Sequence, residues 1–234
     1  MPLPKIQQPL FDITVPSTEK KVKFRPFTVK EEKILLIAQE SRELDEIINS
    51  IKQIVNNCVE DIDVDKLAMF DLEYLLINLR AKSVSNEVEF KIRDPDTDEE
   101  IDLSLDISDI CMKKDPDHTK VIQISDNVHV MMRYPKIDQL KDLGSSTEQN
   151  QSELLFDMMM GCIESVVEGE EVYQLKDFSQ QEIDDFLNSL TTKHIEMIKA
   201  FFDTMPVLRY EKKYKRKDGT EKTFVAEGTE TFFI

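Results

Sequence analysis

The chain has 234 residues, of which 40% are hydrophobic, and this is enough to form a substantial core in one large domain or two small ones. Its 30 basic and 47 acidic residues give a formal net charge of −17, so long-range electrostatics oppose binding to nucleic acids and to anionic membranes. No apolar run approaches the roughly 20 residues that span a bilayer, and the first residues lack the apolar stretch of a secretion signal, which predicts a soluble cytoplasmic protein.

The N-terminal segment, residues 1–85, predicts a β-hairpin followed by helices. Apolar and polar residues alternate on both sides of a proline break, which indicates two short strands within 10–27. Thr28 and Glu31 have the spacing of a capping box, so we expect a helix to begin there. Two further apolar runs at helical spacing predict helices that end at Cys58 and cover about 64–82, the last of them in a central position.

The middle segment, residues 86–145, predicts β-structure. Apolar residues alternate on both sides of an acidic turn from Asp94 to Asp98, which is typical of a β-hairpin. The same alternation on both sides of Asp126 and Asn127 indicates a second pair of strands.

The C-terminal segment, residues 146–234, predicts helices followed by a hairpin. Capping-box pairs open two of the helices, Ser145 with Glu148 for a helix over 145–167 and Ser179 with Glu182 for the next one. A third helix is expected over about 192–204, before Pro206. The chain then predicts two strands around an Asp-Gly turn at 218–219.

This order of elements predicts an α+β fold, with helical halves flanking a β-rich hairpin segment and with β-hairpins at both ends. The corresponding domains are 1–85, 86–145 and 146–234. One integrated domain, with the β-rich segment inserted between two helical halves, fits the sequence equally well.

No metal or cofactor site is predicted. The aspartates at 61, 63 and 65 and those at 94, 96 and 98 have the spacing of the first calcium ligands of an EF-hand, but both stretches lack the glycine at position six and the glutamate at position twelve. We therefore interpret them as solvated turn acids. The three histidines and three cysteines form no ligand motif, and the cysteines are interpreted as buried small hydrophobes.

No catalytic residues are predicted either, because the chain has no nucleophile elbow and only five glycines with which to build a phosphate loop. The numerous carboxylates are interpreted as an ordinary charged surface. Two alternatives to a binding protein stay open. One is an enzyme with an unrecognised carboxylate site, and the other is an acidic decoy that mimics DNA.

Two stretches carry a more specific signal. They read KFRPFTVKEEKILL at 23–36 and FDLEYLLINLRAKSV at 70–84. In this order they resemble the T4-type baseplate hub and baseplate-assembly proteins of contractile-tailed bacteriophages, in which an RPF-x-VKEEK element enters the first helix and an FD-x-EY helix ending in LRAKSV follows. The end of the chain is similar in a less specific way.

The resemblance implies a non-enzymatic protein that builds the hub or the wedge-joining part of the baseplate through contacts with other tail proteins, as a structural protein or a chaperone. The expected location is the host cytoplasm during assembly or the tail baseplate of the virion. The charged runs on the two stretches are either solvated faces or part of a partner surface, and the methionine run at 158–160 is either core or partner contact. The candidate contact residues are Lys30, Glu31, Lys33, Arg80, Lys82, Met159 and Met160.

Overall fold

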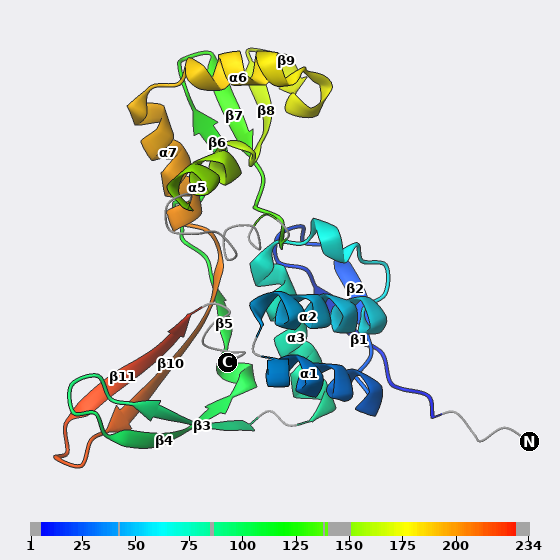
Figure 1. Cartoon of the computed structure of the whole chain (residues 1–234), viewed down its shortest axis with the longest axis vertical. Helices are drawn as coiled ribbons and strands as arrows, with labels where there is room; N and C mark the ends of the chain where they lie inside the picture. Colours follow the sequence, from blue (N-terminus) through cyan, green and yellow to red (C-terminus); the bar gives the residue numbers. More distant parts are fainter. Residues whose placement is uncertain (1–5, 42, 85–86, 138, 140–150, 228–234) are drawn as a thin grey trace, which may run out of the picture. The chain divides into compact units, whose positions relative to one another are not determined.

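The computed structural model describes residues 6–41, 43–84, 87–137, 139 and 151–227. The chain forms two compact units, the first made of 1–113 and 207–234 and the second of 114–206 (Figure 1). Helices and strands in small antiparallel sheets confirm the predicted α+β class. The division into 1–85, 86–145 and 146–234 stays a prediction, and each unit draws on more than one of those segments.

The first unit begins with the predicted hairpin and helices. The strands β1 and β2 pair antiparallel, α1 packs on α2, and α2 packs on α3. The third helix starts later than predicted because the residues before it form a separate 3-10 turn and then an extended N-cap at Ala68. The elements are β1 (Phe11–Thr14), β2 (Lys21–Phe24), α1 (Val29–Ser41), α2 (Leu44–Cys58), the 3-10 turn (Val64–Lys66) and α3 (Met69–Ser83).

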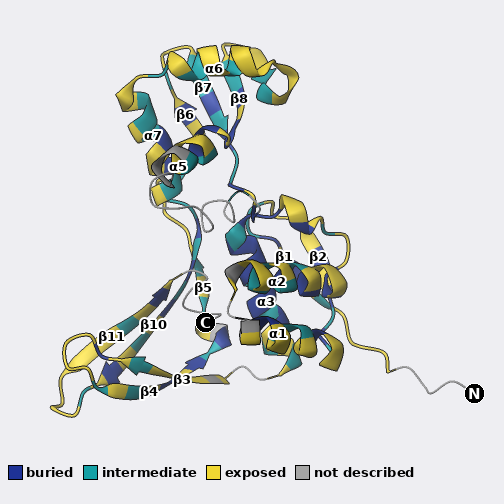
Figure 2. Ribbon diagram, viewed as in Figure 1, coloured by how far each residue is buried: buried dark blue, intermediate teal, exposed yellow. Residues whose placement is uncertain are grey.

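The helix α3 is the central element of this unit, as predicted. Leu72, Leu75 and Leu79 are each at most 1% exposed. Ile77 contributes instead to a second cluster with residues of the β-strands. Because α3 is buried on several sides, it packs both on the helices and on the β-structure of this unit (Figure 2).

The β-structure of the first unit combines a local hairpin with strands from distant parts of the chain. The hairpin of β3 and β4 lies in the middle of the sequence, whereas β5 pairs with β10, which begins only after the second unit. The strands are β3 (Glu87–Arg93), β4 (Glu100–Asp106), β5 (Cys111–Lys113), β10 (Val207–Lys215) and β11 (Glu221–Glu227). Their shared cluster with α3 consists of Ile77, Leu105, Ile107, Leu208, Tyr210 and Ala226.

A buried ion pair fastens the tip of the β3–β4 hairpin to β10 and the turn after it. The carboxylate of Asp94 accepts hydrogen bonds from Nε and Nη2 of Arg216, at 2.8 and 2.6 Å, and from the hydroxyl of Tyr214 at 2.6 Å. Asp94 is 1% exposed, so its interpretation as a solvated turn acid was wrong. The Arg216 guanidinium and the Tyr214 hydroxyl hold the pKa of Asp94 well below its ordinary value.

The described residues of the second unit form a four-stranded antiparallel sheet in the order β6-β7-β8-β9 and the helices α5, α6 and α7. The predicted helix over 145–167 was wrong at its end, because α5 stops at Met160 and β8 follows. A turn at Gly161 and the β-branched residues after it favour the strand. The elements are β6 (Val121–Gln123), β7 (Val128–Met132), α5 (Gln151–Met160), β8 (Ile163–Glu168), β9 (Glu171–Gln174), the 3-10 turn (Leu175–Asp177), α6 (Gln180–Asn188) and α7 (Thr192–Asp203).

Of the two capping-box pairs predicted in the C-terminal segment, one can be compared with the structure. Ser179 and Glu182 form a complete capping box at α6. The pair Ser145 and Glu148 lies outside the described residues. The core of this unit contains Ile122, Val130, Met132, Met159, Met160, Cys162, Ile163, Ile198 and Phe201.

The turn between β10 and β11 contains a glycine that the backbone requires. Gly219 has φ +86°, and its N–H donates to the carbonyl of Arg216 at 3.0 Å. A side chain at this φ is strained, although the space around the position is open. We expect Gly219→Ala to lower the free energy of unfolding of the first unit by about 1 kcal/mol, measured by urea denaturation. The matched control is Lys217→Ala in the same turn, where the side chain is 81% exposed, and an equal loss in both variants would contradict the backbone explanation.

Candidate functional site

The first sequence stretch builds a junction between β2, α1 and α2. The guanidinium of Arg25 donates to Oε1 of Glu31 at 3.1 Å and to the carbonyl of Asn57, at the end of α2, at 3.1 Å. The Glu31 carboxylate also accepts hydrogen bonds from the backbone N–H and the hydroxyl of Thr28, at 2.9 and 2.6 Å. The predicted pairing of Thr28 with Glu31 at the start of α1 is therefore present.

The Glu31 carboxylate is charged although it is buried. Burial alone would raise its pKa, but the hydrogen bonds from Arg25 and Thr28 outweigh this and lower the pKa from 4.5 to about 2. The side chain of Glu31 is 2% exposed, against 28% for Arg25. Glu31 therefore acts inside the fold and offers almost no surface to a partner.

The second stretch is tied to the first one through α3. The Asp71 carboxylate accepts from the backbone N–H of Ser17, in the turn of the first hairpin, at 2.9 Å and from that of Ala68 at 3.1 Å. At the other end of α3, the Ser83 hydroxyl accepts from the backbone N–H of Phe27 at 2.9 Å. The two stretches thus include several residues that hold the fold together.

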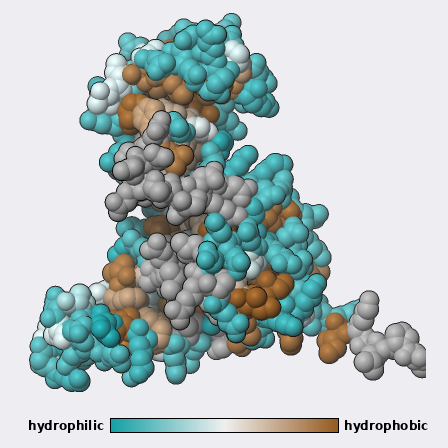
Figure 3. Space-filling model, in the orientation of Figure 1, coloured by the Kyte–Doolittle hydropathy of each residue, from teal (hydrophilic) through white to brown (hydrophobic). Residues whose placement is uncertain are grey.

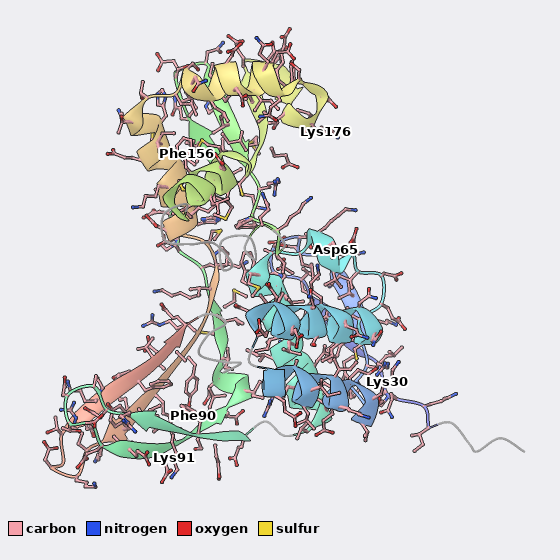
Figure 4. The ribbon with its side chains drawn as sticks, viewed as in Figure 1. Lys30, Asp65, Phe90, Lys91, Phe156 and Lys176 are labelled. Atoms are coloured by element: carbon pink, nitrogen blue, oxygen red, sulfur yellow. The ribbon has the colours of Figure 1, made fainter. Side chains whose placement is uncertain are left out.

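The four basic candidate residues are all exposed. Lys30 and Lys33 lie on α1, and Arg80 and Lys82 lie in the last turn of α3. The bond between Phe27 and Ser83 brings the start of α1 to the end of α3. Figure 4 shows Lys30 at the start of α1. The Lys82 ammonium lies 5.4 Å from the centre of the Phe11 ring.

The two candidate methionines lie in the core of the second unit. Met159 is 8% exposed and Met160 is 3% exposed. Met160 also contributes to the wall of a cavity of about 810 Å³ with Arg133, Asp157, Glu164, Leu175 and Ile183, among others. Core packing, the first of the two interpretations of the methionine run, accounts for the position of both side chains.

Sequence reasoning missed an apolar surface on α1. Val29 is 80% exposed, and Leu36 and Ile37 are 56% exposed. Figure 3 shows hydrophobic surface over this helix. The signal was available, because α1 carries more apolar residues than one buried face can use.

The described residues contain no group of three or more histidine, cysteine or acidic side chains that could hold a metal ion. Both ring nitrogens of His118 are engaged, Nδ1 at 2.9 Å from the Thr204 hydroxyl and Nε2 at 2.9 Å from the Tyr134 hydroxyl. Cys58 and Cys162 are buried as expected, and burial raises the pKa of each thiol to about 11. Cys111 is exposed, so the interpretation as a buried hydrophobe was wrong for this residue.

Comparison with known proteins identifies the family. A family model described as T4 bacteriophage base plate protein matches residues 8–234, which is nearly the whole chain and includes both units. No curated protein and no solved structure matches the chain. Within the part of the chain that the structure describes, no helix is both long enough and apolar enough to cross a bilayer. The chain belongs to the T4 bacteriophage base plate protein family.

Proposed function

We propose that the protein is a baseplate hub subunit or a baseplate assembly factor that acts by protein–protein interaction in tail morphogenesis and not as an enzyme. Its partners are other hub and tail proteins of the phage. It works in the host cytoplasm while the baseplate is built, either leaving afterwards as a chaperone or staying in the virion. The observation that carries the proposal is the family match over residues 8–234.

The charge distribution supports contact through exposed basic residues near the start of α1 and in the last turn of α3. Among the described residues, Lys30, Lys33 and Arg80 are exposed and form no ion pair, although the chain carries a net charge of −17. Cations left unpaired in so acidic a protein are available to carboxylates of a partner. We propose Lys30, Lys33, Arg80 and Lys82 as the contact set.

The acidic-decoy alternative has less support. Such a protein needs rows of carboxylates that imitate the phosphates of DNA. Here basic side chains interrupt the acidic ones, as where Lys222 lies 2.8 Å from Asp96 and Lys217 lies 3.1 Å from Glu99. In the part of the chain that the structure describes, no specific arrangement of residues favours the enzyme alternative.

Reversing two charges tests the contact set. We expect Arg80→Glu with Lys82→Glu to weaken co-purification with the hub proteins of the same phage by about tenfold, because like charges then face the partner's carboxylates. The measurement is co-expression followed by pull-down and native mass spectrometry. Both residues also stabilise the end of α3, at about 0.3–1 kcal/mol each. Arg80→Gln with Lys82→Gln therefore accompanies the reversal, and thermal unfolding confirms that each variant is folded.

The matched control reverses two exposed lysines on α7 in the second unit, Lys193→Glu and Lys199→Glu. It should co-purify like the native chain. If the variant with Arg80→Glu and Lys82→Glu bound the hub proteins as well as this control does, the contact would lie elsewhere. A native chain that binds none of the phage's baseplate proteins would overturn the proposed function. Mass spectrometry of purified phage particles then separates a resident subunit from an assembly factor.

A further inference from the structure

The outward side of α1 differs from that of the neighbouring helix. With about 100° between successive residues of a helix, Val29, Lys33, Leu36, Ile37 and Glu40 fall on one side of α1, and all of them are exposed. Ala38 and Glu31 on the opposite side are buried. We call these five exposed residues the α1 face.

The contrast with α2 shows that exposed apolar residues are not general in these helices. Among the α2 side chains that the structure describes, the exposed ones are all polar: Asp45, Glu46, Asn49, Gln53, Asn56 and Asn57. Single exposed apolar residues are common on protein surfaces. Three of them at positions one, eight and nine of a 13-residue helix form a stripe, which is the pattern by which one helix packs on another.

The part of the α1 face from Lys33 to Glu40 is complementary to itself when reversed. In an antiparallel pair of α1 helices centred between Leu36 and Ile37, each Leu36 lies opposite Ile37 of the other copy. Each Lys33 then lies opposite Glu40 of the other copy, because both pairs are symmetric about the same point. An antiparallel pair with a two-fold axis forms every contact twice. A parallel pair would instead bring Lys33 against Lys33 and Glu40 against Glu40.

We propose that the α1 face binds the α1 face of a second copy of this chain in an antiparallel, two-fold symmetric contact. Leu36 and Ile37 form its apolar centre, and two Lys33–Glu40 pairs fix its direction. The proposal concerns the chain by itself, and a hub partner that bound Lys33 would compete with this contact.

The size of the face sets the strength of this contact. A helix of 13 residues is about 20 Å long, and one such face is smaller than the roughly 800 Å² per partner of a stable complex. The net charge of −17 also makes the two copies repel each other. We therefore expect a weak dimer, with a dissociation constant on the order of 100 µM at about 0.15 M salt.

Charge exchange at Lys33 and Glu40 provides the test. Sedimentation velocity of the full chain, over concentrations from about 10 µM to 1 mM, should show a monomer–dimer equilibrium around that dissociation constant. Lys33→Glu alone and Glu40→Lys alone should each weaken dimerisation by about tenfold, because both pairs become repulsive. An equimolar mixture of the two variants should dimerise as well as the native chain, because every pair in the mixed dimer again joins opposite charges. The double variant should also recover.

Matched controls separate this contact from general effects of charge and folding. Glu46→Lys makes the same charge change on the polar face of α2 and should leave dimerisation less affected than Glu40→Lys. Leu36→Gln should weaken dimerisation and leave the thermal unfolding temperature of the monomer unchanged, because this side chain is already exposed. A chain that stays monomeric up to 1 mM would overturn the proposal. So would a mixture of Lys33→Glu and Glu40→Lys chains that associates no better than either chain alone. The proposal would also be overturned if the α1 face were covered only by another baseplate protein or by the chain's own last residues, and not by a second copy.

Discussion

Replacing Glu31 by glutamine is expected to lower the free energy of unfolding of the first unit by about 2–3 kcal/mol. Glutamine keeps the shape of the side chain but removes the charge that Arg25 faces at 3.1 Å, and it leaves a guanidinium only 28% exposed without its carboxylate. Breaking a buried pair by removing one partner typically costs about 3–5 kcal/mol, and the partial exposure of Arg25 reduces this. Urea denaturation at pH 7, followed by hydrogen exchange of residues 11–83, measures the loss.

The same carboxylate makes stability depend on pH. Its folded pKa of about 2 lies below the ordinary value of 4.5, so folding favours the ionised form. The contribution is therefore complete above about pH 4.5 and is lost as the pH falls towards 2. The difference in stability between the native chain and Glu31→Gln should shrink over this range. Glu32→Gln is the control, since Glu32 is the exposed neighbour. A comparable loss in that variant would show that charge on α1, and not the buried pair, is responsible.

Replacing Asp94 by asparagine is expected to release the β3–β4 hairpin from β10 and the turn after it. Asparagine keeps one acceptor oxygen, which the Arg216 guanidinium and the Tyr214 hydroxyl then have to share. In place of the second oxygen it has an amide N–H₂, which is a donor and cannot accept their hydrogen bonds. The temperature of unfolding of the first unit should fall by about 5–10 °C. Hydrogen exchange should accelerate in the β3–β4 hairpin and in the β10–β11 hairpin. Because the pKa of Asp94 is lowered on folding, this stabilisation too is present above the ordinary value of 3.8 and is lost at more acidic pH.

Asp98→Asn is the matched control for the same turn. Its side chain is 81% exposed and lies 3.7 Å from Arg93, also an exposed side chain. This variant should unfold close to the native temperature. If Asp94→Asn left the hairpins as protected as Asp98→Asn does, the buried pair would not be what joins them.

The elements with strong local signals were predicted from the sequence. Ser179 with Glu182 gives a complete capping box at α6, and the Asp-Gly turn joins β10 to β11, because these signals depend on residues a few positions apart. The strand β8 was missed since the apolar run of α5 continues into it, and a short apolar run does not distinguish helix from strand. The strand β5 was missed since its partner β10 follows only after the second unit.

The site was predictable in part. The stretches 23–36 and 70–84 gave the family, which the match over residues 8–234 confirms. The burial of Glu31 was not visible in a charged run, because Arg25 and the end of α2 create it in three dimensions. Arg216 is 122 positions from Asp94, so no local pattern connects them. A contact role for the candidate basic residues stays a prediction.

The insertion of the second unit has a consequence for the order of folding during synthesis. Ile77, Leu105 and Ile107 leave the ribosome before residues 114–206, whereas Leu208, Tyr210 and Ala226, which cover them, follow. At translation rates of about 5–20 residues per second, synthesis of the inserted residues takes roughly 5–20 s. The nascent chain therefore holds an uncovered apolar surface for that time. The first unit therefore completes its core only after the second unit has been synthesised.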